Sequence, residues 1–559
     1  MNPPRSILDY VYEHEAARAD QVFLTQPVGG GQVVDYTWGQ VLDQARRMAA
    51  HLRGRGLAPG ARVAMLSKNC AHFIMAELAI WMAGGTTVAI FPTESAENVR
   101  FVLDHSESSL LFVGKLDTWA QQSVGVPASL PCIALPLAPP TGFETWDAIV
   151  GCTEPIAGRP SRGPDDLAML LYTSGSTGQP KGVMQSFGRI TRTTELRVAD
   201  TRDRIPDDLE RRSLSYLPLA HAYERAVVEC GHLLEGRGRV YFSDSLATFT
   251  EDLKRARPTS FVSVPRLWLK FQQAVFAATP REQLDRMLDD PAIGKEVGRK
   301  VLAGLGLDHV RVAASASAPA PPELLAWYRR LGLNLLEGYG MTEDFAYSHR
   351  TTEDSNAPGF VGLPAPGVEV RISDEGEILV RSPGQLVGYY KRPDLDRESF
   401  TEDGFFRTGD LGERREDGQL RITGRVKELF KTAKGKYVAP APIENQLNAH
   451  PMVELSLVSG VGQPAPYAVL VLDEHLRPRL GDPTVRARVQ ADLARLLEEV
   501  NRGLAAHERL QMLVVAADPW SIENGCLTPT MKIKRSRIEA SVAARVEAWY
   551  GHPEPVVWA

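Results

Sequence analysis

The sequence predicts an α/β protein with a large N-terminal domain of parallel-rich sheets and a small α+β domain at its C-terminal end. Three observations support this class. Strand-like apolar runs alternate with helical patterns from about residue 35 to 345, which is typical of parallel sheets joined by helices. Short β segments separated by turn residues occupy 361–424. Beyond residue 425, a long helical repeat marks a segment of different character.

The first strands and helices follow this alternation. The run Arg62–Leu66 predicts a strand, 71–82 a helix and 87–91 the next strand. This helix and the strand after it form the most apolar part of the chain, but Glu77 and a pair of glycines interrupt it. A membrane-spanning helix needs roughly 18 to 20 uninterrupted apolar residues. The stretch therefore predicts a buried helix and a strand.

Later stretches complete the outline of the domains. The proline-rich stretch 126–142 predicts an irregular connection. The segment 361–424 predicts a small antiparallel sheet or β-barrel-like subdomain within an N-terminal domain of residues 1–425. Residues 426–559 are predicted to form the C-terminal domain, in which Asp482-Pro483 begins a helix. Its apolar positions recur at helical spacing: Val485, Val489, Leu493, Leu496, Leu497, Val500 and Leu504.

Composition and charge exclude several classes of protein. The chain has 559 residues, of which 43% are hydrophobic and 24% charged, as in an ordinary globular protein of two or three domains. A formal net charge of −6 argues against nucleic acid as the main partner. The five cysteines are scattered and form no Cys-x-x-Cys pair, which argues against a disulfide framework or a zinc site.

The sequence also predicts a cytoplasmic location. The N-terminal stretch MNPPRSILDYVYEHEAARAD lacks the apolar core of a signal peptide. The cysteine pattern fits a reducing compartment. Peripheral contact with the inner face of the membrane is left open.

The passage LAMLLYTSGSTGQPKGV predicts a phosphate-binding loop. An apolar run typical of a buried strand ends at Tyr172 and leads through a loop of small hydroxyl residues and glycines to Lys181. Backbone N–H groups in such a loop approach phosphate oxygens closely. The loop residues are Thr173, Ser174, Gly175, Ser176, Thr177 and Gly178. The strand before the loop disfavours the alternative of a flexible surface loop, and the late position of Lys181 argues against a Walker A motif.

This loop resembles the signature loop of the acyl-adenylate-forming (AMP-binding) superfamily, which includes acyl-CoA synthetases, peptide-synthetase adenylation domains and firefly luciferase. A second passage, LLEGYGMTED, resembles the same superfamily. The resemblance implies that Tyr339 and Gly340 bind the nucleotide and that Thr342 and Glu343 lie at the phosphates and Mg²⁺. A carboxylate is a hard ligand suited to this ion. Outside this context, Glu343 would be interpreted as a solvated acid.

Two further passages resemble the superfamily in the same order. In FRTGDLGERREDGQLRITGRVKELF, the resemblance implies that Asp410 accepts hydrogen bonds from the ribose hydroxyls and that Arg425 binds the nucleotide. The alternatives for these two residues are a turn residue and a surface charge. The passage KTAKGKYVAPAPIEN then resembles the segment that leads into the C-terminal domain, and the resemblance implies a hinge at Lys427.

A fifth passage, LTPTMKIKRSRIE, implies that Lys532 is the catalytic lysine. Many members of the superfamily have glycine before this lysine, where this chain has Met531. The TPT-x-K-x-KR form resembles long-chain fatty acyl-CoA synthetases. The passage SYLPLAHAYER also resembles fatty acyl-CoA synthetases, although its His221 fits a packed core histidine equally well. ASASAP resembles a segment beside adenine, with Ala316 in place of the common glycine.

The resemblance implies chemistry in two half-reactions. The carboxylate of a medium- to long-chain fatty acid attacks the α-phosphate of ATP, and pyrophosphate leaves. Mg²⁺ at Thr173 and Glu343, the loop donors and Lys532 offset the developing charge. A mobile C-terminal domain then rotates, and coenzyme A attacks the acyl-AMP. The expected partners are therefore a fatty acid, ATP and coenzyme A.

Several alternatives stay open at this point. The chain could be a fatty acyl-AMP ligase that loads an acyl carrier protein, or a ligase for another carboxylic acid. A luciferase-like oxidation on the same scaffold would depend on oxygen and emit light. A catalytically silent acyl-binding protein is disfavoured by a full set of polar site residues: Thr173, Lys181, Glu343, Asp410, Arg425 and Lys532.

Overall fold

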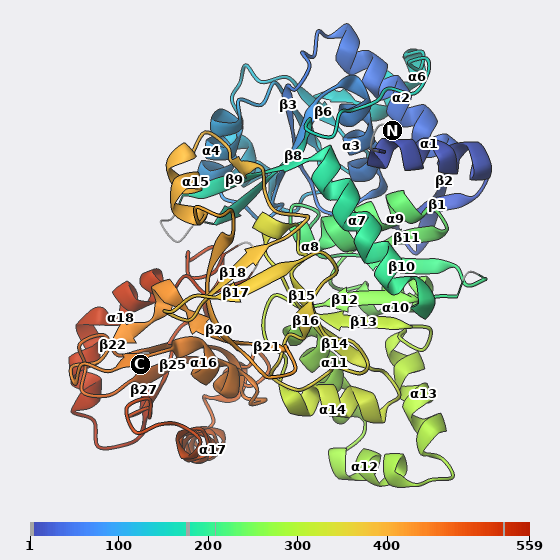
Figure 1. The fold of residues 1–559 in the computed structure, drawn as a ribbon. Helices are drawn as coiled ribbons and strands as arrows, with labels where there is room; N and C mark the ends of the chain where they lie inside the picture. The colour runs from blue at the N-terminus through green and yellow to red at the C-terminus, as the bar shows by residue number, and fades with distance from the viewer. Residues whose placement is uncertain (1–4, 175–178, 207, 529–530) are drawn as a thin grey trace. The chain divides into compact units, whose positions relative to one another are not determined.

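The computed structural model describes residues 5–174, 179–206, 208–528 and 531–559, which form two compact units (Figure 1). The first unit comprises Met1–Asn356, Gly362–Val370 and Val380–Phe406. The second comprises Ala357–Val361, Arg371–Leu379 and Arg407–Ala559. The domain boundary between residues 425 and 426 stays a prediction.

The largest sheet of the first unit is mostly parallel. Its strands pair in the order β19-β9-β8-β4-β3-β5-β6-β7. All neighbours from β8 to β7 run parallel, whereas β9 is antiparallel to both β8 and β19. The strands are β3 (Arg62–Leu66), β4 (Thr86–Ile90), β5 (Leu110–Val113), β6 (Cys132–Ala134), β7 (Glu144–Thr145), β8 (Leu167–Ser174), β9 (Pro180–Ser186) and β19 (Gly388–Tyr389).

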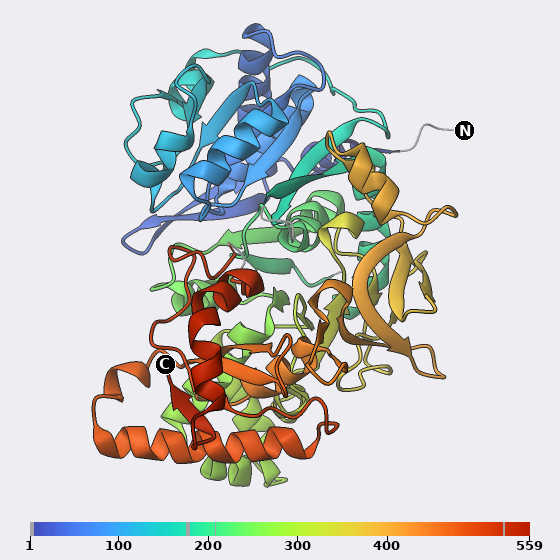
Figure 2. The ribbon, with the colours of Figure 1, turned by 90° about the vertical axis from the view of Figure 1, so that its left-hand side faces the viewer.

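The apolar segment after β3 confirms the predicted alternation of strand, helix and strand. Helix α3 (Ala71–Ala83) is buried along its whole length and packs against α2 (Trp38–Gly54). A helix that is apolar on all sides belongs inside a protein, which explains the absence of an amphipathic pattern. Figure 2 shows blue helices lying against the face of the blue N-terminal sheet.

The sequence predicts that the proline-rich stretch 126–142 is wholly irregular, but the structure differs. The stretch contains β6, whose Ile133 and Ala134 are buried and pair in parallel with Phe112 and Val113 of β5. Prolines flank this three-residue strand on both sides and conceal it in the sequence, because proline is a signal for turns and connections.

Two smaller sheets complete the first unit. One has the order β10-β11-β1-β2 and the other the order β12-β13-β14-β15-β16, with β12, β13 and β14 parallel. The strands are β1 (Val22–Gly29), β2 (Gln32–Thr37), β10 (Arg211–Ser215), β11 (Gly238–Phe242), β12 (Ser260–Ser263), β13 (Val312–Ser315), β14 (Leu335–Tyr339), β15 (His349–Arg350) and β16 (Leu363–Pro364).

Helices connect and cover these sheets. They are α1 (Ile7–Arg18), α4 (Ala96–Ser106), α5 (Trp119–Gln122), α6 (Trp146–Cys152), α7 (Phe187–Thr201), α8 (Ala222–Glu224), α9 (Cys230–Glu235), α10 (Phe249–Ala256), α11 (Pro265–Ala278), α12 (Arg281–Asp289), α13 (Gly294–Leu305), α14 (Pro322–Arg330) and α15 (Pro393–Ser399). Among the described residues, no helix is both long and apolar enough to cross a membrane.

The predicted short β segments form a sheet with the order β17-β18-β20-β21, most of which belongs to the second unit. A second sheet has the order β24-β25-β26-β27, and β22 pairs with β23. The strands are β17 (Glu369–Ile372), β18 (Glu377–Arg381), β20 (Phe406–Arg414), β21 (Leu420–Arg425), β22 (Phe430–Lys431), β23 (Tyr437–Val438), β24 (Val453–Ser459), β25 (Tyr467–Leu472), β26 (Leu513–Val515) and β27 (Val556–Trp558).

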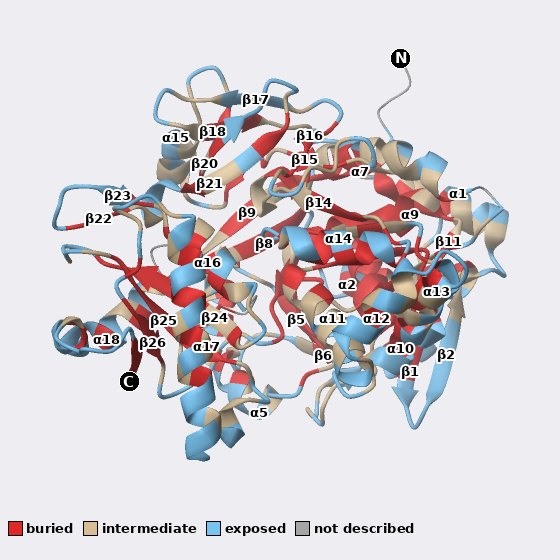
Figure 3. Ribbon diagram, turned by 90° about the horizontal axis from the view of Figure 1, so that it is seen from below, coloured by how far each residue is buried: buried red, intermediate tan, exposed pale blue. Residues whose placement is uncertain are grey.

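The long helical repeat near the C-terminus is confirmed as α17 (Pro483–Arg502). Asp482 caps it by accepting a hydrogen bond from the backbone of Thr484 at 2.8 Å, as the Asp-Pro pair predicted. Val489, Leu493 and other apolar residues at helical spacing face the core, and the opposite side is exposed (Figure 3). Helices α16 (Pro440–Asn448) and α18 (Arg535–Tyr550) complete this α+β part. The predicted α/β fold class is confirmed.

Candidate active site

The phosphate-loop prediction covers the end of β8, the start of β9 and the residues that connect these two antiparallel strands. Strands β8 and β9 pair so that Thr173 lies opposite Lys181, at the end of the hairpin. Both residues are partly exposed. The predicted loop residues Gly175, Ser176, Thr177 and Gly178 lie outside the described residues, and Ser174 is the last described residue before them.

The second predicted passage leaves the sheet at the end of β14. Tyr339 is the last residue of this strand, and Thr342 and Glu343 follow in a 3-10 turn, Thr342–Asp344. Gly340 is required by close packing, because a Cβ there would lie 2.8 Å from the carbonyl carbon of Ala346. The turn is thus packed tightly against its own continuation.

Several hydrogen bonds hold Glu343. The Tyr389 hydroxyl donates to its Oε1 at 2.8 Å, and the backbone N–H of Leu386 donates to its carbonyl oxygen at 2.6 Å. The neighbouring Asp344 is buried, and its Oδ1 accepts from the backbone of Met341 and Tyr347. Burial raises the pKa of Asp344 to about 7. The Glu343 turn is therefore anchored on both sides.

Tyr389 also contacts the phosphate-loop strand. Its ring centroid lies 5.3 Å from Nζ of Lys181, and it pairs in the sheet with Val183 of β9. Burial and the Glu343 carboxylate raise the pKa of the Tyr389 hydroxyl, so the hydroxyl keeps its proton and donates. The structure thus brings Lys181 and Glu343 to the same tyrosine, which the sequence analysis did not single out.

The segment predicted to lie beside adenine packs next to the end of β14. Ala316 follows β13, and its methyl group would lie 4.0 Å from a Cβ at Gly338. Ser317 adopts a left-handed conformation, with φ of 73°. The backbone N–H of Ala320 donates to Glu337 at 3.0 Å, and burial raises the pKa of Glu337 to about 7. Glu337 was another residue that the sequence analysis missed.

In the second unit, the structure brings two predicted nucleotide-binding residues together. Asp410 on β20 pairs with Arg425 on β21, and Arg425 Nε lies 2.9 Å from Asp410 Oδ1. The Asp410 side chain is 10% exposed and that of Arg425 is 56% exposed. The mostly buried Asp410 is therefore held on an inner strand of the sheet, and the more exposed Arg425 lies beside it on the edge strand.

The predicted hinge and catalytic lysines are both exposed residues of the second unit. Lys427 lies in a 3-10 turn directly after β21. The backbone N–H of Lys532 donates to the Thr528 hydroxyl, and its carbonyl oxygen accepts from the Thr528 N–H. Met531 has a φ of 62°, a left-handed conformation in which glycine is unstrained. This backbone conformation is a physical reason for the glycine that many superfamily members have there.

Comparison with known proteins decides the family. The sequence model described as "AMP-binding enzyme" matches residues 12–390, and that described as "AMP-binding enzyme C-terminal domain" matches 428–554. The chain belongs to the AMP-binding enzyme family. The prediction made from the five sequence passages is confirmed.

Curated relatives cover nearly the whole of this AMP-binding enzyme. It is 32% identical to the long-chain-fatty-acid–CoA ligase FadD15 of Mycobacterium bovis, over 97% of this chain and 96% of the relative. It is 28% identical to human long-chain-fatty-acid–CoA ligase 1, over 95% of this chain and 85% of the relative. The alignments span both compact units.

Solved structures share the fold. The adenylation domain of a carboxylic acid reductase from Segniliparus rugosus, in complex with AMP, superimposes with a TM-score of 0.80 at 22% identity, covering 98% of this chain and 94% of that one. The anthranilate CoA ligase AuaEII superimposes with a TM-score of 0.77 at 19% identity, covering 98% and 99%.

The passage SYLPLAHAYER has structural roles in this AMP-binding enzyme. His221 caps the short helix α8, because its Nδ1 accepts from the backbone of Tyr223 at 3.1 Å. Arg225 is wholly buried, with ion pairs to Glu77 at 2.6 Å and to Glu229 at 3.2 Å. His221 is half-buried, and the structure gives it a capping role.

The basic end of the fifth passage is also partly structural. Arg535 binds both carboxylate oxygens of Glu444, at 2.8 and 2.9 Å, and donates to the carbonyl of Val458. The Arg535 side chain is 17% exposed. It fastens the start of α18 to α16 and β24, whereas its neighbours Lys532 and Lys534 are exposed.

The donor set near the phosphate loop fits Mg²⁺ held together with a triphosphate. Among the described residues, no cluster of three His, Cys, Asp or Glu side chains forms a metal cage. Mg²⁺ usually takes one or two protein oxygens and completes its shell with phosphates and water. The Glu343 carboxylate and the Thr173 hydroxyl are hard oxygen donors of that kind, and Tyr389 occupies only one Glu343 oxygen.

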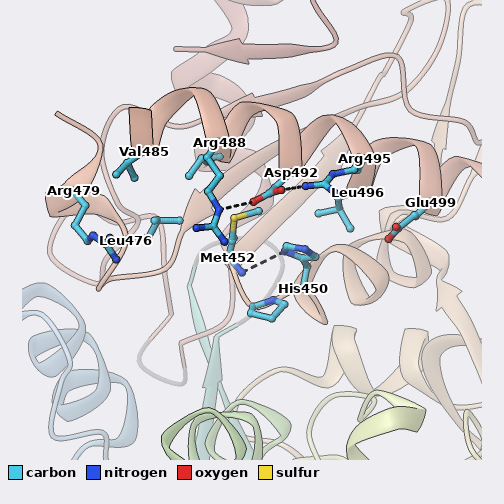
Figure 4. A pocket seen from close by; sticks show the side chains of 12 residues that line it. His450, Met452, Leu476, Arg479, Val485, Arg488, Asp492, Arg495, Leu496 and Glu499 are labelled. Atoms are coloured by element: carbon cyan, nitrogen blue, oxygen red, sulfur yellow. Dashed lines mark hydrogen bonds and ion pairs between the residues drawn. The ribbon is translucent and has the colours of Figure 1, made fainter. Parts of the chain in front are cut away.

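A groove of about 560 Å³ lies along α17 in the second unit (Figure 4). Its rim charges compensate one another: Asp492 pairs with Arg495, and its Oδ2 lies 3.8 Å from Nε of Arg488. Its described lining residues include none of the predicted site residues. We therefore assign no part of the reaction to this groove.

Proposed function

We propose that this AMP-binding enzyme activates a medium- to long-chain fatty acid as acyl-AMP, releases pyrophosphate and transfers the acyl group to coenzyme A. The observation that carries the proposal is the convergence of Lys181 and Glu343 on Tyr389, at the end of the hairpin that bears Thr173. The names of the relatives, long-chain-fatty-acid–CoA ligases matched over almost the whole chain, support the substrate class.

The first half-reaction joins two anions, so positive charge and hydrogen-bond donors must offset their repulsion. Lys181 and the loop after Thr173 hold the phosphates, and bound Mg²⁺ would supply further positive charge next to Glu343. Lys532 reaches the carboxylate and the α-phosphate as a compact cation. Tyr339 stacks on adenine, with Gly340 and Thr342 at the nucleotide.

Asp410 and Arg425 hold the ribose end of the nucleotide. In the structure their side chains bond to each other across β20 and β21. A buried carboxylate that an ion pair already holds is pre-oriented to accept hydrogen bonds from the two ribose hydroxyls. The Arg425 side chain is more than half exposed, so the nucleotide can reach it. Lys427 is the hinge for the C-terminal domain.

Pyrophosphate exchange tests the reaction and its substrate class. The wild-type protein is incubated with ATP, labelled pyrophosphate and a series of acids from acetate to oleate, with aromatic acids included. We expect Mg²⁺-dependent exchange that improves with chain length, because each buried methylene contributes about 0.8 kcal/mol. Better turnover of acetate or an aromatic acid than of every fatty acid would overturn the substrate class, and ADP as product would overturn the reaction.

The acyl acceptor is tested separately. Acyl-AMP formed in the first assay is divided between coenzyme A and a holo acyl carrier protein, and the thioester products are quantified. We expect acyl-CoA. Exclusive loading of the carrier protein would instead support the alternative of an acyl-AMP ligase.

A further inference from the structure

The segment 384–390 connects the two halves of the candidate phosphate site. On one side it pairs with β9: the N–H of Val387 donates to Met184 at 2.9 Å, and the N–H of Tyr390 donates to Gly182 at 2.8 Å. On the other side, the N–H of Leu386 donates to the carbonyl oxygen of Glu343. The segment therefore lies between the strand that carries Lys181 and the turn that carries Glu343.

Close packing fixes this segment in place. A Cβ at Gly384 would lie 2.4 Å from the carbonyl oxygen of Asp344, so only glycine fits there. The amide of Gln185, which is fully buried on β9, donates to the carbonyl oxygens of Gly384 at 3.1 Å and Thr342 at 3.4 Å. The backbone positions of Tyr389 and Glu343 are thus set relative to each other.

Tyr389 adds a polar contact that packing alone does not need. Its side chain is 4% exposed, and a phenylalanine would fill the same space. Its hydroxyl donates to Glu343 Oε1 at 2.8 Å, while the face of its ring lies 5.3 Å from Lys181 Nζ. A hydrogen bond to a carboxylate is stronger and more directional than one between neutral groups.

We propose that Tyr389 is a positioning residue. Its hydroxyl orients the Glu343 carboxylate for Mg²⁺, and its ring holds Lys181 close to the same tyrosine. The inference rests on the proposed function, since it concerns the site that holds Mg²⁺ and ATP. Tyr389 occupies Oε1 and leaves Oε2 for the ion, so the carboxylate presents one oxygen in a defined direction. The aromatic face attracts the ammonium group of Lys181 and restricts the positions of this group.

The variant Tyr389→Phe distinguishes the role of the hydroxyl from the role of the ring. This change keeps the ring that faces Lys181 and removes only the donor to Glu343. The matched control is Tyr390→Phe, which removes a hydroxyl from the next residue of the same segment, where the ring contacts His105 and Arg62 instead. Thermal melting of both variants verifies that they fold.

Calorimetric titration with α,β-methylene-ATP measures nucleotide binding without adenylation. We expect Tyr389→Phe to raise the dissociation constant about ten- to a hundredfold in the presence of Mg²⁺, as loss of one hydrogen bond to a charged group predicts. In EDTA its dissociation constant should match that of wild type within about twofold, because the Lys181 contact is retained. Tyr390→Phe should match wild type in both conditions.

A parallel series measures the Mg²⁺ dependence of pyrophosphate exchange. The Mg²⁺ concentration for half-maximal exchange should rise in Tyr389→Phe, and saturating Mg²⁺ should restore most of the rate. Binding that is unchanged, or weakened equally with Mg²⁺ and with EDTA, would overturn the assignment and leave Tyr389 a packing residue. If wild type shows no exchange with any fatty acid, the proposed function fails, whereas calorimetry still decides the role of Tyr389.

Discussion

Lys532, the predicted catalytic lysine, is an exposed residue of the second unit. Thr528 holds its backbone through backbone and hydroxyl hydrogen bonds. The charge it would offset develops only where the carboxylate meets the α-phosphate. We therefore expect Lys532 to contribute to acyl-AMP formation and to have no role in thioester formation.

Lys532→Ala is therefore expected to separate the two half-reactions. Pyrophosphate exchange should fall about 10²- to 10³-fold, a loss typical of removing one transition-state contact. The same variant, supplied with synthetic acyl-AMP and coenzyme A, should still form acyl-CoA at a substantial rate. Lys534→Ala removes an exposed cation from the same passage and should leave both rates near those of wild type. Equal loss of both half-reactions in a folded Lys532→Ala protein would contradict this division.

The Glu337 side chain couples β14 to the segment 316–320. Its Oε1 accepts the backbone N–H of Ala320, and its other oxygen is buried. Burial raises its pKa from 4.5 to about 7. Between these two pH values, the folded protein binds a proton that the unfolded chain has lost, so this group's contribution to stability decreases as pH rises.

Glu337→Gln should remove the contribution of this side chain to the pH dependence of stability. The amide keeps an oxygen acceptor for Ala320 but never ionises. Relative to wild type, the variant should gain up to about 3 kcal/mol in unfolding free energy between pH 5 and pH 8, measured by urea denaturation. Glu353→Gln, at an exposed acid, is the control. A stability difference between Glu337→Gln and wild type that stays constant across this range would show that burial does not shift this pKa.

At the scale of the whole molecule, the proposed cycle requires the C-terminal domain to rotate about Lys427. This residue lies in the exposed turn directly after β21. Proline fixes φ near −65° and removes the freedom that a hinge needs. The neighbouring Arg425 keeps its place in the sheet, so nucleotide binding is separable from rotation.

Lys427→Pro should retain pyrophosphate release but lose acyl-CoA formation, the reverse of Lys532→Ala. A single-turnover assay that follows pyrophosphate and acyl-CoA separately would measure both. Lys427→Ala removes the same side chain without restraining the backbone and should perform both steps. Acyl-CoA formation at the wild-type rate in Lys427→Pro would show that no rotation about this residue is needed.

The alternation of apolar patterns determined the α/β class, and five ordered passages determined the family. These features are local: a buried strand needs a short apolar run, and a phosphate loop needs small residues in sequence. Even α17 and its Asp482 cap followed from spacing and capping alone. The strand β6 was missed because its flanking prolines outweighed three apolar residues in a local pattern.

Only the tertiary structure decided what surrounds Glu343. Tyr389 and Gln185 contact the Glu343 turn but are far from it in sequence, and no motif marks them as functional. Sheet pairing between β19 and β9 brings Tyr389 beside Lys181, and the 3-10 turn after β14 brings Glu343 to the same hydroxyl. The direction of a carboxylate depends on such long-range contacts, because local sequence sets a residue's chemistry but burial and packing set its geometry.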